Sequence, residues 1–264
     1  MKPNTQQLND LVTQVRRDIL RMVHAVNSGH PGGSLGCTEF FVAMYQNLMD
    51  RKDTFNMDGI GEDLFFLSNG HISPVFYSVL ARSGYFPVAE LATFRKINTR
   101  LQGHPTTHDG LPGVRMAAGS LGQGLSVSIG AAEAKKLNND PHIVYVLTGD
   151  GELQEGQNWE AIMYASAKKV DNLIATVDLN GKQIDGSTDE VLAMGSLKAK
   201  FEAFDWDVLD EYALWKLHYV GLDDTDLIDF WESIFQKRLE SGQKPDCKHG
   251  YPRRHKYRNS LFIQ

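Results

Sequence analysis

Two stretches that each begin with apolar residues, separated by a helix-like run, carry the main architectural signal. The first is VYVLTGDGELQEG, residues 144–156, and the second is NLIATVDLNGK, residues 172–182. Each begins with apolar and β-branched residues, which are typical of a buried strand, and each ends in polar residues with glycine. Two strands joined by a crossover helix of this length predict a parallel βαβ unit. The sequence therefore favours an α/β fold.

This unit would bring Asp150 and Asn180 to the same edge of the sheet. Each follows the carboxyl end of a strand, where open α/β sheets bind ligands. A carboxylate oxygen, an amide oxygen and a main-chain carbonyl just after Asn180 would suit a hard cation such as Mg²⁺, with positions left for phosphate. Gly149 and Gly151 would let the backbone approach a diphosphate closely. The alternative interpretation is a polar turn followed by an ordinary asparagine turn.

Composition narrows the class of protein. The chain has 264 residues, 42% of them hydrophobic, which permits one large α/β domain or a domain with an appendage. Its net charge of −6 gives no electrostatic reason to expect nucleic acid or an anionic membrane as a partner. Cys37 and Cys247 are too few for a disulfide framework or a metal cluster. Without an apolar signal core or a membrane-length apolar run, we expect a cytoplasmic protein.

Helical periodicity dominates the first part of the chain. Apolar residues recur at helical spacing over 5–26, and a helix is expected there. The segment NSGHPGGS, residues 27–34, should end this helix because it contains glycines and a proline. Ser34 is placed to cap a second helix over 35–49. His30 would then lie in a glycine-walled loop, where it either faces a ligand or is simply solvated.

Two further histidines occur in similar turns. His71 follows an expected buried strand over 63–68 and precedes a helix, whose free backbone N–H groups would suit an anion. His104 lies in a Gly-His-Pro turn. The segment GSLGQG, residues 119–124, precedes a helix of small residues over 126–136. Its glycines would let the backbone lie against a flat ligand or against another helix.

The remaining expected elements complete a sheet with helices around it. A short helix is expected over 86–95, a crossover helix over 154–169, a helix over 195–204 and a strand over 206–209. The residues of the crossover helix expected to face inward are Trp159, Ile162, Met163 and Ala167.

Taken together, these motifs closely resemble those of the transketolase family. The matching segments run in the order found in that family, from about residue 8 to residue 209. They are SGHPGGSLG (28–36), LSNGH (67–71), GHP (103–105), GSLGQG (119–124), GDGELQEG (149–156) and DLNGK (178–182). The resemblance is to the N-terminal, diphosphate-binding part of the family. It implies the thiamine-diphosphate-binding fold, which is a mainly parallel sheet flanked by helices on both faces.

The resemblance also implies a cofactor and a metal. Transketolases use thiamine diphosphate and a divalent metal to move a two-carbon ketol unit between sugar phosphates in the pentose phosphate pathway. By resemblance, Asp150, Asn180 and the carbonyl of Lys182 would ligate Mg²⁺, or else Ca²⁺ or Mn²⁺. His71 and Gly151 would contact the diphosphate side of the cofactor, and Asn180 would also lie against it.

Other residues are implied to face the aminopyrimidine or the sugar. The backbone of Gly119, Ser120 and Leu121 would line the aminopyrimidine. His30 and His104 would face the reacting sugar as catalytic groups, because imidazole donates to or accepts from a hydroxyl near neutral pH. The thiazolium itself stabilises the carbanion, so the protein would mainly orient and polarise the substrate.

Length makes the resemblance more specific. A full transketolase has two more domains, and the glutamate that activates the cofactor lies in the first of them. We therefore expect the N-terminal subunit of a split transketolase, inactive alone. Its partner would be a C-terminal subunit carrying the pyrimidine-binding domain, in a hetero-oligomer with two of each chain. The alternatives are a subunit of a deoxyxylulose-phosphate synthase or 2-oxoacid dehydrogenase type of enzyme, and a non-catalytic fragment.

The resemblance fades after Leu209. We expect a transketolase-like domain over 1–210 and a divergent tail over 211–264, with a helix over 223–239. Residues 246–258 are polar and basic, which predicts an irregular segment. Neither the family's last strand nor its last cofactor histidine can be placed there. The loss of that strand would expose a sheet edge.

Overall fold

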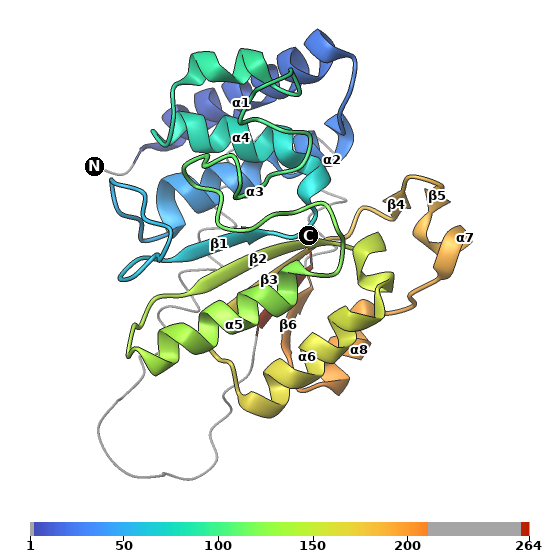
Figure 1. Cartoon of the computed structure of the whole chain (residues 1–264). Helices are drawn as coiled ribbons and strands as arrows, with labels where there is room; N and C mark the ends of the chain where they lie inside the picture. Colours follow the sequence, from blue (N-terminus) through green and yellow to red (C-terminus); the bar gives the residue numbers. More distant parts are fainter. Residues whose placement is uncertain (1–2, 211–259, 264) are drawn as a thin grey trace.

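The computed structural model describes residues 3–210 and 260–263. Its centre is a five-stranded sheet with the order β1-β2-β3-β7-β6 (Figure 1). The strands are β1 (Leu64–Leu67), β2 (Val144–Gly149), β3 (Leu173–Asp178), β6 (Asp207–Asp210) and β7 (Ser260–Ile263). Every neighbouring pair in this sheet runs parallel. The α/β class and the βαβ unit around β2 and β3 are therefore confirmed.

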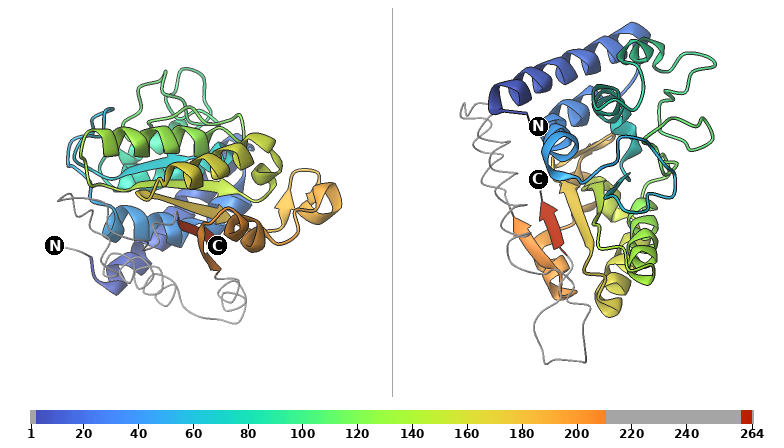
Figure 2. Two further views of the ribbon diagram at one scale, coloured as in Figure 1. Left: turned by 90° about the horizontal axis from the view of Figure 1, so that it is seen from below. Right: turned by 90° about the vertical axis from the view of Figure 1, so that its left-hand side faces the viewer.

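Helices cover both faces of the sheet (Figure 1, Figure 2). Successive strand residues alternate between two cores, so that Phe65 and Leu67 enter one core while Leu64 and Phe66 enter the other. The first face carries α1 (Thr5–Val26), α2 (Pro31–Gly36), α3 (Thr38–Ala43), η1 (Met44–Leu48) and α4 (Ser73–Arg82). The second carries α5 (Gly124–Leu137), α6 (Gly156–Lys168) and α8 (Leu197–Ala203). Strands buried on both faces explain the continuous apolar runs of the sequence.

Short elements connect these layers. They are η2 (Gly70–Ile72), η3 (Val88–Thr93), η4 (Gly151–Gln154), α7 (Thr188–Leu192), and the antiparallel pair β4 (Lys182–Gln183) and β5 (Gly186–Ser187). Within the part of the chain that the structure describes, no helix combines the length and the apolar character needed to cross a membrane.

Near the N-terminus, α1 matches the helix expected from the sequence, and the elements that follow it do not. The expected helix over 5–26 is confirmed, and the side chain of Asn4 caps it by accepting from the backbone of Gln7. The expected single helix over 35–49 is wrong, because the chain forms α2, α3 and η1 instead. Pro31 opens α2 earlier than expected, since its fixed φ suits the first helical position. Ser34 therefore falls inside α2, where its hydroxyl donates to the carbonyl of His30 at 2.8 Å.

The inner face of α6 also differs from the expected one. Met163 is 54% exposed and Ala167 is exposed as well, whereas Ala161 and Ala165 are buried beside Ile162. The small side chains of Ala161 and Ala165 allow α6 to pack closely on the sheet. The buried face of the helix is therefore not the one expected from its larger apolar side chains. The partly buried ring of Trp159 packs instead on the ring of Phe201, with 5.7 Å between their centroids.

The end of the chain differs from a third expectation. Residues 260–263 form β7, which pairs in parallel with β3 on one side and β6 on the other. The last strand of the sheet, which could not be placed from the sequence, is therefore present, and the divergent tail expected over 211–264 includes it. Without β7, the facing edges of β3 and β6 would have unpaired N–H and C=O groups. A short apolar segment between the two strands forms hydrogen bonds with both edges. The expected helix over 223–239 and the basic run over 246–258 lie outside the described residues.

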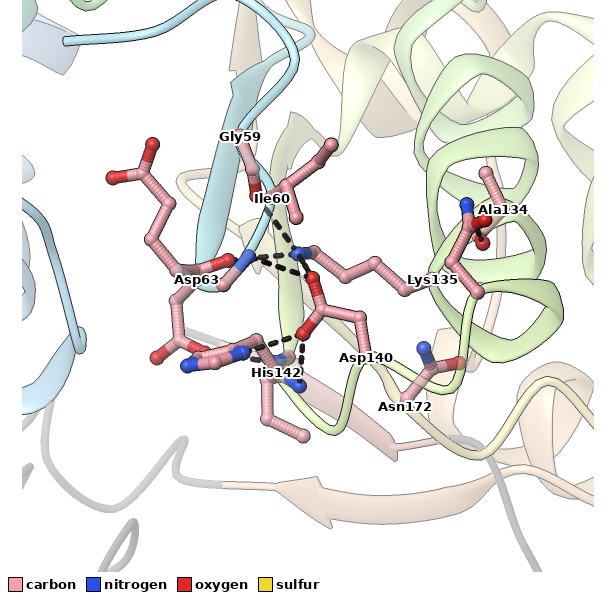
Figure 3. Close-up of polar contacts among 12 residues, drawn as sticks. Gly59, Ile60, Asp63, Ala134, Lys135, Asp140, His142 and Asn172 are labelled. Carbon is pink, nitrogen blue, oxygen red and sulfur yellow. Dashed lines mark hydrogen bonds and ion pairs between the residues drawn. The ribbon is translucent and has the colours of Figure 1, made fainter.

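A buried lysine ties down the loop that precedes β1, at the amino end of the sheet (Figure 3). Nζ of Lys135, on α5, donates to the carbonyls of Gly59 at 3.1 Å and Glu62 at 2.8 Å. It also lies 2.8 Å from the Asp140 carboxylate, and both side chains are less than a tenth exposed. Nδ1 of His142 approaches the same carboxylate at 2.5 Å. The cluster stabilises the fold at the edge opposite the carboxyl ends of the strands.

Lys135→Met should therefore destabilise the protein. Removing one partner of a buried pair leaves the other charge uncompensated, and the expected loss of unfolding free energy is about 3 kcal/mol. Urea unfolding followed by circular dichroism measures this loss. The matched control is Lys198→Met, which removes an exposed pair with Glu202 and should cost at most about 0.5 kcal/mol. Equal effects of the two substitutions would contradict the structural role of Lys135.

Candidate active site

Three polar turns meet at the carboxyl edge of the sheet. Each follows a different strand, and they comprise residues 69–71 after β1, 149–151 after β2 and 180–182 after β3. Parallel pairing fixes this arrangement, because Gly149 at the end of β2 lies opposite Asp178 at the end of β3. The structure thus places the predicted metal and diphosphate residues along one edge of the sheet.

Asp150 joins the turns after β2 and β3 directly. Its carboxylate accepts from the N–H of Gly181 at 2.7 Å and from its neighbour Gly151 at 2.8 Å. Burial raises the pKa of Asp150, while these two hydrogen bonds oppose that rise. The side chain is only 3% exposed, so a fixed carboxylate lies at the point where the two turns touch.

Asn180 is oriented by partners on both ends of its amide. Its oxygen accepts from the N–H of Lys182 at 2.8 Å, and its nitrogen donates to the Asp178 carboxylate at 3.0 Å. Burial raises the pKa of Asp178 to about 6, and the hydrogen bond from Asn180 opposes that rise. The thiol of buried Cys37 also hydrogen bonds to Asp178. Asp178 was given no role from the sequence. Its position as the acidic last residue of an otherwise apolar strand could have indicated one.

The side-chain oxygens of Asp150 and Asn180 are suitable ligands for a hard divalent cation. An ionised carboxylate has about four acceptor positions, and the hydrogen bonds described above use two of those on Asp150. The amide oxygen of Asn180 accepts one hydrogen bond and keeps a second lone pair. Oxygen ligands of this kind are those that Mg²⁺ and Ca²⁺ take. The carbonyl of Lys182 as a third ligand stays a prediction.

Buried amide groups without a protein partner also fit a site completed by a ligand. Asn69 is 1% exposed, and neither its amide oxygen nor its nitrogen has a hydrogen-bond partner among the described residues. Buried polar atoms are rarely left unpaired. Asn69 lies beside Gly149, where an added Cβ would be 3.8 Å from the Cβ of Asn69. The unpaired amide therefore lies next to the turn that carries Asp150.

The three predicted histidines converge from distant positions in the sequence. The rings of His30 and His71 lie 5.1 Å apart at an angle of 67°. His104 lies close to both rings. Its charge lowers the pKa of His71, and the charge of His30 lowers the pKa of His104. Burial lowers the pKa of each ring, and that of His71 falls to about 4. At neutral pH the cluster is therefore uncharged, and each imidazole has one donor and one acceptor nitrogen.

The glycine turn before α5 borders this histidine cluster. Gly119 lies against His104, since an added Cβ would approach the Cβ of that histidine to 3.4 Å. Ser120 and Leu121 are exposed, so this part of the turn is open to a ligand or a partner chain. A Cβ on Gly70 would lie 2.4 Å from the Cβ of Ala118, so the turns after β1 and before α5 pack closely. The structure thus gathers all of the predicted site residues into one region.

Besides Asp178, two further charged residues of this region were not predicted. Arg95 lies near the histidines, and its charge contributes to the lowered pKa of His30 and His104. Its guanidinium donates to the hydroxyl of Ser28 at 2.8 Å. Arg95 was expected to be the last residue of a helix and was therefore given no role. In the structure it takes a left-handed conformation with φ of 55°. Glu152 is the second, and it is buried among the turns.

Comparison with known proteins agrees with this geometry. The family described as the transketolase thiamine diphosphate binding domain matches residues 8–220. The chain is 40% identical over 194 residues to the 6-deoxy-6-sulfo-D-fructose transketolase subunit SqwG of Clostridium sp. (strain MSTE9), an alignment that covers 74% of this chain and 70% of that protein. It is 38% identical over 231 residues to an apulose-4-phosphate transketolase subunit of Actinobacillus succinogenes, with 86% and 79% covered respectively.

Solved structures support the same relationship. The transketolase of Campylobacter jejuni superposes with a TM-score of 0.77 and 29% sequence identity, covering 99% of this chain and 38% of that one. The described fold thus corresponds to about a third of a full-length transketolase. Because the family match extends over most of the sequence, the chain belongs to the transketolase family and contains its thiamine diphosphate binding domain.

Proposed function

We propose that this chain is the N-terminal subunit of a split transketolase that transfers a two-carbon ketol unit between sugar phosphates in the cytoplasmic pentose phosphate pathway. The contact of Asp150 with Gly181 carries the proposal, because it joins the two turns that would hold the metal and the diphosphate. Two relatives that this chain largely covers are named as transketolase subunits, which supports a divided enzyme.

The proposed cofactor is thiamine diphosphate with Mg²⁺, or with Ca²⁺ or Mn²⁺. Asp150, Asn180 and the carbonyl of Lys182 would hold the metal, while His71 and Gly151 would contact the diphosphate. When bound, the thiazolium would supply the stabilisation of a carbanion. A neutral His71 suits this place, since it can donate one hydrogen bond to phosphate without a charge.

The chain's own residues would orient the sugar and the aminopyrimidine. His30 and His104 are uncharged near pH 7, because burial lowers the pKa of both. Each can therefore accept a proton from a sugar hydroxyl as a general base, and the imidazolium formed in this way can return that proton to an alkoxide as a general acid. The backbone of Gly119, Ser120 and Leu121 would line the aminopyrimidine beside His104.

Asp150→Ala tests the metal assignment. The substitution removes a direct oxygen ligand, so the Kd of thiamine diphosphate in the presence of Mg²⁺ should rise at least about 100-fold, given that even indirect partners of a metal matter by roughly 10- to 100-fold. Isothermal titration calorimetry on the assembled protein measures this change. The exposed Asp58, at the amino end of the sheet, provides the control variant Asp58→Ala. Unchanged cofactor affinity in Asp150→Ala would show that the assignment is wrong.

His30→Ala should separate catalysis from cofactor binding. The imidazole would act on the sugar, so loss of it should slow turnover by roughly 10²–10⁴ while the Kd of thiamine diphosphate stays unchanged. Steady-state kinetics and calorimetry on the same preparation measure the two quantities. A His30→Ala variant with normal turnover would remove this residue from the catalytic machinery.

Ketol transfer should require a second chain. The partner would be a C-terminal subunit with the pyrimidine-binding domain, assembled as two of each chain, and the single chain should show no transfer. Activity assays with and without this partner test the requirement. The donors would be xylulose 5-phosphate, the two sugars named for the relatives above, and pyruvate. Transfer by the single chain, or from pyruvate alone, would contradict the proposal, and no activity with any donor would favour a non-catalytic fragment.

A further inference from the structure

A single buried carboxylate connects three turns around the proposed cofactor site. Glu152, on η4, is only 2% exposed. One of its oxygens accepts from the backbone N–H of Gly149 at 3.0 Å. The other accepts from the backbone N–H of Gly122 at 2.8 Å and from the hydroxyl of Ser68. The donors thus come from the end of β2, the turn before α5 and the end of β1.

Each donor is next to a segment assigned to the cofactor. Gly149 directly precedes Asp150, and Gly122 directly follows the turn over 119–121. Ser68 directly precedes the turn over 69–71 that carries His71. The carboxylate therefore holds the proposed metal end and aminopyrimidine end through backbone N–H groups, and the histidine turn through the hydroxyl of Ser68.

The network continues into the start of α5. The hydroxyl of Ser68 accepts from the N–H of Gly124, the first residue of that helix, at 3.0 Å. A Cβ on Gly124 would lie 2.3 Å from this hydroxyl oxygen, so the helix start and the end of β1 leave no room for a side chain between them. The turns can therefore shift only together while these contacts last.

The chemistry of this position calls for an ionised carboxylate. All three groups that point at Glu152 are donors, and an ionised carboxylate is the side chain that only accepts. Burial of its charge is unfavourable, and the three donors and the positive end of the α5 dipole reduce this cost. A glutamine would keep the shape but would direct an amide N–H₂ at one of the donors.

We propose that Glu152 is a positioning residue, which fixes the distance between the turn of Asp150 and the turn over 119–121. A ligand that spans both turns then finds them already in place, whereas a ligand that does not reach the turn over 119–121 does not depend on that distance. The inference rests on the proposed function, since thiamine diphosphate is the ligand that would span them. Glu152 acts through the backbone N–H groups of Gly149 and Gly122 and the hydroxyl of Ser68, and takes no proton.

The test compares thiamine diphosphate, which would span both turns, with inorganic diphosphate, which is too short to reach the turn over 119–121. The chain assembled with its partner subunit is titrated with thiamine diphosphate and Mg²⁺, and separately with inorganic diphosphate and Mg²⁺. In Glu152→Gln, the Kd of thiamine diphosphate should rise about ten- to hundredfold, in line with lost hydrogen bonds to a charged group, while the Kd of inorganic diphosphate changes less than about threefold. Glu202→Gln, on the exposed face of α8, is the matched control and should change neither.

Further variants keep the test decisive if Glu152→Gln fails to fold. Ser68→Ala removes one of the three donors, and it should weaken thiamine diphosphate selectively but by a smaller factor. Where Glu152→Gln folds, the double variant should raise the Kd of thiamine diphosphate by less than the product of the two single factors, because both substitutions act in one network.

Each result bears on a specific claim. Unchanged affinity, or an equal loss for both probes, would overturn the positioning role while leaving the proposed function intact. A wild-type assembly that binds no thiamine diphosphate would overturn the proposed function, and this inference with it.

Discussion

The parallel pairing of β2 with β3 is the constraint from which the geometry of the site follows. Its register sets Gly149 opposite Asp178, so the next residues of the two strands must emerge together at one edge. The carboxylate of Asp150 then accepts a hydrogen bond from the N–H of Gly181. Shifting this register by one residue would exchange the two cores, because alternate residues of each strand face opposite sides. The buried strands therefore fix the site geometry as firmly as they fix the fold.

The two edges of the sheet have different tasks. At the carboxyl edge, short polar turns hold Asp150, Asn180 and the histidines with little bulk between them. At the amino edge, Lys135 gathers carbonyl groups and the Asp140 carboxylate into a buried cluster that ties down a long loop. A site that must admit a ligand needs groups with spare hydrogen-bonding capacity, whereas a structural cluster is most stable when its groups are satisfied. The unpaired amide of Asn69 at one edge and the fully engaged lysine at the other illustrate this division among the described residues.

Packing against distant parts of the chain explains two of the departures from the sequence-based expectations, those at α6 and β7, whereas the departure at α2 is local and follows from Pro31. The start of α2 at Pro31 moved Ser34 from a cap into the helix, where it bonds to the carbonyl of His30. The face of α6 was chosen by how closely Ala161 and Ala165 let it approach the sheet, and this distance cannot be seen in helical periodicity. The strand β7 consists of only four residues, and it is recognisable only once β3 and β6 present a slot for it.

Local sequence patterns were enough to establish the α/β class, the βαβ unit and most of the residues that gather at the site. Strand periodicity, glycine turns and the spacing of Asp150 and Asn180 can be recognised without knowledge of the fold. The contacts among His30, His71 and His104, the place of Asp178 behind Asn180, and the central position of Glu152 emerged only from the folded chain. These depend on which turns lie side by side across the sheet, and residues distant in sequence become neighbours only when the chain has folded.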